Sequence, residues 1–307
     1  MRPPIAGTGK LRITRRGFIK YTGATTLTLY ASTKLGLRVA IAQIPGGTLD
    51  PHSVAKYQTP MLIPPVMPRA GKRVRTGGKN ADYYEISVKQ FPQQILPAGH
   101  PATIVWGYGA IASENKRGLL LHNAPSLTIE AEYDRPTVVK WVNDLVDANG
   151  DYLPHLLPVD QTLHWANPPG GTTGRDTRPV FTSTPGYYTG PVPIVTHLHG
   201  AVGVGDESDG YAEAWYLPSA NDVPAGYAAE GTWYDFFAGK AMNRFGETWG
   251  PGYAIFQYPN LGRPAADWYH DHTLGMTRVN VYAGPAGFYI IRGGPDDTVI
   301  DSRSGSH

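Results

Sequence analysis

Short runs of β-branched and aromatic residues, separated by connections rich in glycine and proline, dominate this sequence. Turn signals bound nearly all of these runs. They cover residues 82–91, 102–109, 126–132, 136–143, 193–200, 266–272 and 286–293. No stretch shows a sustained apolar period of 3.6 residues, and the 307-residue chain holds 37 Gly and 28 Pro, which disfavours a helical bundle. The pattern predicts an all-β fold, either a sandwich or a barrel.

Two segments, 165–191 and 216–252, interrupt this pattern and are expected to be long surface loops. Loops of such length inside a compact domain are often functional or binding elements. The last segment, 293–307, is expected to be a linker. We therefore predict one β domain over 43–292, interrupted by two long insertions.

The first 42 residues differ from the rest because they hold eight Lys and Arg and no Asp or Glu. Within them, the stretch ITRRGFIKYTG carries Arg15 and Arg16 with Phe18 two residues later, an order that matches the twin-arginine export pattern. Small residues around Ala42 suit cleavage there. The uncharged run 21–33 is shorter than the roughly 20 residues that span a bilayer, so no stable membrane anchor is expected. We predict a signal peptide over 1–42 and a periplasmic or extracellular destination.

The basic balance of the whole chain comes from this amino-terminal segment. Removing its 8 basic residues from the 27 Lys and Arg leaves 19 against 25 Asp and Glu, so the formal charge of the remainder becomes −6. An acidic chain lacks the positive surface that binds nucleic acid, and that class of partner is excluded.

Two pairs of histidines stand two residues apart within strand-like runs. His197 and His199 lie in PIVTHLHG, and His270 and His272 lie in WYHDH. With 10 His in 307 residues, composition alone predicts roughly 0.3 such pairs. Alternate strand residues share a face, so each pair presents two imidazoles side by side. They either bond to the main chain as ordinary core or surface histidines, or hold a metal.

The donor set narrows which metal these histidines would bind. The chain contains no Cys, which excludes disulfides, thiol nucleophiles and thiolate-bound metals within it. Neutral imidazoles are costly to bury unless their lone pairs are used. Imidazole donors without thiolate suit copper or zinc.

The residues around both pairs resemble the amino-terminal half of a multicopper oxidase, in the group of spore-coat laccases, bilirubin oxidases and phenoxazinone synthases. The motifs that carry the resemblance are THLHG (196–200), SDGYAEAW (208–215) and WYHDHTLGMTRVNVYAGPAGFYIIRG (268–293). Similar stretches upstream, such as HLLPVDQTLHWA (155–166), extend it over nearly all of 43–292. The resemblance implies a cupredoxin-like Greek-key β-sandwich with long loop insertions.

The resemblance also implies roles for single residues in a trinuclear copper cluster that reduces O₂ to water. His197 would bind the type 2 copper, His199 and His270 one type 3 copper, and His272 the other. Asp209, in SDG, falls where the family keeps an acid that steers protons to reduced oxygen. One extra residue separates it from the first pair, and a turn-capping role is the alternative.

The sequence departs from the complete family pattern in one large respect. The full enzyme needs a carboxy-terminal cupredoxin domain with His-Pro-x-His-x-His and His-Cys-His motifs, and the sequence contains neither. The thiolate-bound type 1 copper is therefore absent from this chain. We expect a fragment whose missing carboxy-terminal cupredoxin domains are its partners.

Two classes of function remain open. The first is a laccase-like oxidase that takes single electrons from a phenol, a pigment or a metal ion and passes them to O₂. The second is an exported copper-binding module without turnover. A zinc hydrolase is a weaker alternative, because neither histidine pair includes a Glu or another carboxylate placed to activate water.

Overall fold

The structure is a computed structural model that describes residues 49–71, 74–114, 121–295 and 297. The predicted signal peptide, 1–42, and most of the predicted linker, 293–307, lie outside the described residues. The chain divides into two compact units, Met1–Lys56 and Tyr57–His307. The described part of the first unit contains one 3₁₀ turn, η1 (Pro51–Ser53), in which the main-chain N–H of His52 is capped by the side chain of Asp50.

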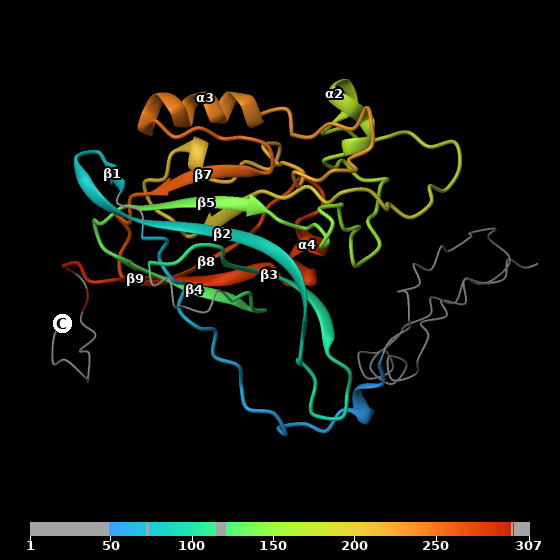
Figure 1. The fold of residues 1–307 in the computed structure, drawn as a ribbon, viewed down its shortest axis with the longest axis horizontal. Coiled ribbons are helices and arrows are strands. Elements are labelled where there is room, and N and C mark those ends of the chain that lie inside the picture. The colour runs from blue at the N-terminus through green and yellow to red at the C-terminus, as the bar shows by residue number, and fades with distance from the viewer. Residues whose placement is uncertain (1–48, 72–73, 115–120, 296, 298–307) are drawn as a thin grey trace, which may run out of the picture. The chain divides into compact units, whose positions relative to one another are not determined.

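The second unit is built on two β-sheets, and all other elements belong to it (Figure 1). The five-stranded sheet contains β1 (Val74–Thr76), β2 (Lys79–Gln93), β5 (Thr137–Asn143) and β7 (Tyr253–Tyr258) in that order, with β3 (Thr103–Ala110) also paired to β2. The four-stranded sheet has the order β4 (Ser126–Glu132), β9 (Ala286–Arg292), β8 (Ala265–Asp271) and β6 (Thr196–His199).

Each sheet combines antiparallel pairs with one parallel pair. The parallel pairs are β2 with β5 and β4 with β9, so strands distant in sequence become neighbours. Such crossovers give the sheets their Greek-key connectivity. The predicted all-β, cupredoxin-like sandwich is confirmed, and every predicted run contains a strand.

The prediction that 216–252 is only a loop was wrong, because it contains helix α3 (Tyr234–Phe245). This helix buries only Tyr234, Phe237 and Ala241, a stripe too short to produce a sustained helical period in the sequence. It ends at Gly246, which adopts the left-handed conformation with φ of 74°. Figure 1 shows α3 lying beside β7 at the edge of the larger sheet.

The remaining elements are short and lie in the connections between strands. Residues 165–191 contain only a 3₁₀ turn and one helical turn, so this segment is largely the loop that the sequence predicts. The short elements are η2 (Pro168–Gly170), α2 (Gly171–Gly174), η3 (Asp206–Ser208) and α4 (Thr277–Ala283). None of the helices among the described residues combines the length and apolar character needed to cross a membrane.

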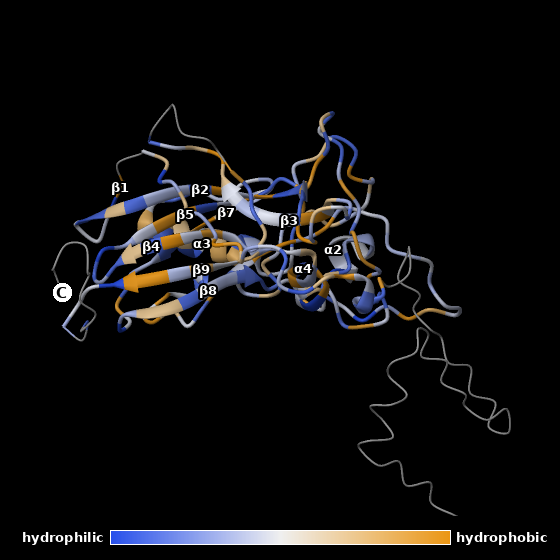
Figure 2. Ribbon diagram, turned by 90° about the horizontal axis from the view of Figure 1, so that it is seen from below, coloured by the Kyte–Doolittle hydropathy of each residue, from blue (hydrophilic) through white to orange (hydrophobic). Residues whose placement is uncertain are grey.

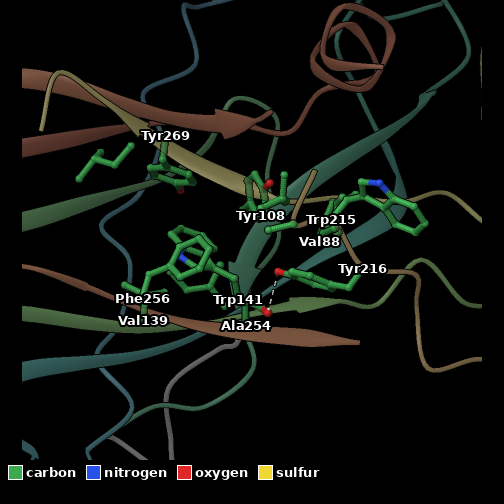
Figure 3. Close-up of a cluster of buried hydrophobic side chains, with 14 of the residues drawn as sticks. Val88, Tyr108, Val139, Trp141, Trp215, Tyr216, Ala254, Phe256 and Tyr269 are labelled. Carbon is green, nitrogen blue, oxygen red and sulfur yellow. Dashed lines mark hydrogen bonds between the residues drawn. The ribbon is translucent and has the colours of Figure 1, made fainter. Parts of the chain in front are cut away.

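The core of the second unit is rich in aromatic side chains, and several of their polar tips are bonded internally. Trp141 Nε1 donates to the hydroxyl of Tyr258 at 3.1 Å, and the hydroxyl of Tyr216 donates to the main-chain carbonyl of Trp141 at 3.0 Å (Figure 3). Tyr108 and Tyr269 pack against the same indole at 5.3 Å between ring centroids. Pairing these polar tips offsets the desolvation penalty of burying the rings, whereas Nε1 of the buried Trp165 has no hydrogen-bond partner among the described residues.

The four-stranded sheet buries alternate residues and leaves the others outside. Strand β9 alternates in this way, with Tyr289 buried and Phe288 exposed, and apolar colour runs along β4 and β9 in Figure 2. In β6 and β8, Leu198 and Tyr269 face the core. The residues that alternate with them face outward, and these include the histidines.

Candidate metal centre

Both histidine pairs are brought together by the antiparallel pairing of β6 with β8. His197 lies directly opposite His270 in the ladder, and His199 lies opposite Trp268. The main-chain N–H of His272 donates to the carbonyl of Val195 at 2.7 Å, which continues the pairing past the end of β8. Cross-strand partners share a face of the sheet, so all four imidazoles project to one side.

The distances between the rings are those of a single cluster. The centroid of the His197 ring lies 5.7 Å from that of His199, 5.6 Å from that of His270 and 5.0 Å from that of His272. One nitrogen each from His197, His199 and His270 lies within 4.8 Å of the others. His272 adjoins this group without belonging to it. The structure thus gathers the four histidines selected from the sequence.

Hydrogen bonds leave ring nitrogens available in this cluster. Nδ1 of His270 donates to the main-chain carbonyl of Asp271 at 2.7 Å, and its Nε2 is buried without a hydrogen-bond partner among the described residues. Nδ1 of His272 is also buried without a partner there. A buried imidazole nitrogen with an unused lone pair is costly unless it binds an ion. The residues present therefore fit a metal held by imidazole.

Burial also fixes the protonation state of the second pair. The pKa of His270 is lowered to about 4, mainly by burial and also by the neighbouring imidazoles, while the hydrogen bond to the carbonyl of Asp271 acts in the opposite direction. Burial lowers the pKa of His272 as well, with His197 acting in the same direction. Both rings are consequently neutral at pH 7, which is the form that binds metal ions.

Trp268 is a member of this face that the sequence analysis did not single out. Its indole stacks on the ring of His270 at 4.1 Å and on that of His199 at 5.3 Å. The signal was present in WYHDH, because Trp268 and His270 are two residues apart and share a face. The indole, 38% exposed, holds both imidazoles from the solvent side, next to the exposed Phe288 of β9.

Asp209 lies beside the first pair, as its place in the sequence suggested. Its carboxylate is 3.6 Å from Nδ1 of His197, and its side chain is 56% exposed. The close approach depends on Gly210, which has φ of 74° and where a Cβ would fall 2.1 Å from the carbonyl oxygen of Thr196. A residue with a side chain at 210 would push this loop away from β6.

Asp271 was assigned no role from the sequence, yet it is fully buried behind the second pair. Its carboxylate accepts four hydrogen bonds, and burial raises its pKa to about 6. The sequence did offer a sign of this role, because Asp271 lies between two histidines at a position that faces inward. Acidic side chains are rarely buried unless they are paired.

Taken together, the fold and the cluster define a β-sandwich that presents a histidine-only candidate metal site on one sheet face. The chain is 32% identical over 213 residues to a laccase from Bacillus subtilis, covering 69% of this chain and 30% of the laccase. It is 32% identical over 242 residues to a laccase from Haloferax volcanii, covering 78% of this chain and 31% of that one. It is 33% identical over 192 residues to multicopper oxidase LPR1 of Arabidopsis thaliana, covering 62% of this chain and 23% of that one.

These relatives identify the chain as a member of the multicopper oxidase family, corresponding to its amino-terminal portion. The chain spans about 30% of the length of the two laccases and 23% of that of LPR1. No family model matches it. Among solved structures, a laccase from Pediococcus acidilactici aligns with a TM-score of 0.41 and 17% identity, covering 78% of this chain and 32% of that one.

Proposed function

We propose that this chain supplies half of the ligands of a trinuclear copper cluster in a laccase-like multicopper oxidase. The observation that carries the proposal is the set of four imidazoles on one open sheet face, two of them with buried nitrogens that lack a hydrogen-bond partner in the described part of the chain. Copper is favoured because the donors are imidazoles alone and the relatives are multicopper oxidases. Bound copper would supply one-electron chemistry toward O₂.

The roles of the individual residues are those that the resemblance to multicopper oxidases implies. His197 would hold the type 2 copper, His199 and His270 one type 3 copper, and His272 the other. Trp268 keeps two of these rings in place by stacking. Asp209 has an exposed carboxylate next to His197, a position from which it can carry protons between solvent and the cluster.

The other ligands would come from cupredoxin domains outside this sequence, together with the thiolate-bound copper that accepts electrons. Support comes from the two laccases, of which this chain covers only about 30%, and from the exposed Trp268 and Phe288 flanking the histidines. An apolar, imidazole-bearing face is suited to burial against a second domain. The reductant would be a phenol, a pigment or a metal ion, with O₂ as the acceptor.

We also propose that residues 1–42 direct twin-arginine export, that 43–292 form the cupredoxin domain and that 293–307 link it onward. The destination would be periplasmic or extracellular. A copper protein that acquires metal during folding is suited to a route that carries folded chains.

The alternative function is an exported copper-binding module without turnover. It is favoured by the absence of Cys from this chain, because no electron entry site exists within it. The coding sequence that follows His307 separates the two functions. An in-frame His-Cys-His motif supports the oxidase, whereas a stop codon supports the module.

Copper binding itself is tested by titrating the purified 307-residue chain with Cu(II) at pH 7. We expect uptake by imidazole, without a thiolate-to-copper absorption band and without oxidation of phenols by the isolated chain. His197→Ala and His270→Ala should each weaken uptake, while circular dichroism stays unchanged. His100→Ala, outside the cluster, serves as the control. Equal uptake by all four proteins would refute the proposed site.

A further inference from the structure

A buried chain of polar side chains lies behind the histidine cluster, on the opposite side of the sheet from the imidazoles. It begins at the carboxylate of Asp271, which accepts from the main-chain N–H of Val195 at 3.2 Å and from the hydroxyl of Thr273 at 2.8 Å. No Lys or Arg pairs with this carboxylate among the described residues. Its position therefore depends entirely on neutral donors.

Asn280 of helix α4 joins the two segments that carry the histidines, and the hydroxyl of Thr273 bonds the same two groups, Asp271 and Pro193 O. Its side-chain Nδ2 donates to the Asp271 carboxylate at 2.9 Å and to the main-chain carbonyl of Pro193 at 3.2 Å. Asp271 separates His270 from His272, and Pro193 leads into β6, which carries His197 and His199. One fully buried amide thus ties the segments that carry both pairs.

His155 in turn orients the amide of Asn280. Nδ1 of His155 accepts from the main-chain N–H of Leu157 at 2.8 Å, so the proton is on Nε2, which donates to Asn280 Oδ1 at 3.0 Å. The indole of Trp106 packs edge-on against this imidazole at 4.6 Å. With its oxygen engaged by His155, the amide of Asn280 must present its nitrogen to Asp271 and Pro193.

We propose that Asn280, oriented by His155, is a positioning residue that sets the spacing of the two histidine pairs for copper. Neither side chain touches a ring of the cluster in any hydrogen bond of the described residues. The inference rests on the proposed copper-binding function. Outer partners of metal ligands change metal affinity by roughly 10- to 100-fold when they are removed.

The test compares Asn280→Leu with a matched control, Asn143→Leu. Asn143 is also buried, and its amide makes three hydrogen bonds, to Val192 O, Tyr216 O and Leu145 N–H. Both variants lose a buried amide of equal size, but only Asn280 contacts the segment between His270 and His272. Cu(II) affinity and the electron paramagnetic resonance spectrum of bound Cu(II) are measured where urea titration shows each protein folded.

We expect Asn280→Leu to weaken Cu(II) binding by about tenfold or more and to alter the hyperfine splitting of the spectrum. Asn143→Leu should lower the urea midpoint while retaining the parent affinity and spectrum. If both variants bind Cu(II) like the parent, or lose affinity alike, the positioning role is wrong. If the parent itself binds no Cu(II), the proposed function fails and this inference fails with it.

A second pair of variants keeps the test decisive if Asn280→Leu does not fold. His155→Gln retains an amide N–H near the position of the imidazole Nε2, whereas His155→Leu removes it. We expect the Leu variant to bind Cu(II) more weakly and the Gln variant to restore affinity and spectrum toward the parent. Equal behaviour of the two variants would contradict the proposal.

Discussion

Nδ1 of His197 lies 2.5 Å from the main-chain carbonyl oxygen of Asp209 and 3.6 Å from the carboxylate of the same residue. The shorter contact identifies the carbonyl as the group that accepts the ring N–H and orients the imidazole. Nε2 of His197 is then the nitrogen that keeps its lone pair for a metal. The carboxylate of Asp209 is left exposed beside the cluster, where it is free for another role.

This arrangement predicts that Asp209→Asn leaves copper binding by the chain nearly unchanged. The substitution removes the carboxylate and keeps the carbonyl that holds His197. Cu(II) titration of parent and variant at pH 7 measures the effect. A large loss of affinity in the Asn variant would mean that the carboxylate, and not the main chain, positions the ring.

Gly210→Ala should damage both the fold and the site. At φ of 74° a Cβ would lie 2.1 Å from Thr196 O and 2.8 Å from Cα of His197. The left-handed conformation alone costs about 1–2 kcal/mol for a residue with a Cβ, and the clash adds to that. Urea denaturation should show lower stability, and Cu(II) binding should weaken because the loop that holds His197 moves.

Gly239→Ala is the control for this prediction, and we expect it to raise the stability of the fold. Gly239 lies in α3, and a Cβ there would meet nothing within 4 Å. Alanine loses less entropy than glycine in a helix, so the variant should gain about 0.5–1 kcal/mol without a change in copper affinity. Destabilisation by both substitutions, or by neither, would contradict the prediction that a Cβ is tolerated at Gly239 and not at Gly210.

The stability of the metal-free chain should fall as the pH is lowered from 7 to 5. Burial lowers the pKa of His122, His155 and His270 from 6.5 to about 4. Between these values the unfolded chain takes up protons that the folded chain does not, so acid favours unfolding. Asp271 opposes the trend, because its folded pKa of about 6 lies above the ordinary value of 3.8.

The three imidazoles lower the free energy of unfolding as the pH falls, and the one carboxylate raises it. We therefore expect a net loss of stability on acidification. The urea midpoint measured at pH 7 and pH 5 checks it, and His155→Gln should show a shallower dependence because one buried imidazole is gone. A midpoint that is constant or higher at pH 5 would show that these rings are not held neutral in the fold.

Tyr216→Phe should lower the free energy of unfolding by about 1–3 kcal/mol, because it leaves the carbonyl of Trp141 buried without its partner. Copper affinity should be unaffected, since the hydroxyl lies in the aromatic core (Figure 3). Tyr187→Phe is the control, because Tyr187 is 67% exposed. Equal urea midpoints for the parent and Tyr216→Phe would refute the role of this hydrogen bond.

Replacing Arg15 and Arg16 by Lys should leave the precursor in the cytoplasm, because the twin-arginine pathway requires the arginine pair. Cell fractionation and immunoblotting measure the distribution, and Lys10→Arg, which keeps the pair, is the control. Undiminished export of the Lys variant would exclude this route. Mass spectrometry of the exported product checks cleavage near Ala42.

Local patterns in the sequence were sufficient to predict seven of the nine described strands and both histidine pairs. The spacing of His197 and His199 places them on one face whatever strand lies beside them, because alternation is a property of each strand alone. Strands β1 and β7 and helix α3 were not predicted in this way. Strand β1 has only three residues. Strand β7 follows directly on the long insertion, and α3 buries too few residues to repeat a period.

The sequence by itself determined the donors: four histidines in two pairs, with no cysteine to bind metal instead. Tertiary structure decided that the pairs form one cluster, since the pairing of β6 with β8 joins residues about 70 positions apart. It also decided that Asn280 contacts His155, 125 residues away. Such contacts depend on how the sheets pack as a whole, and no local spacing in the chain encodes them.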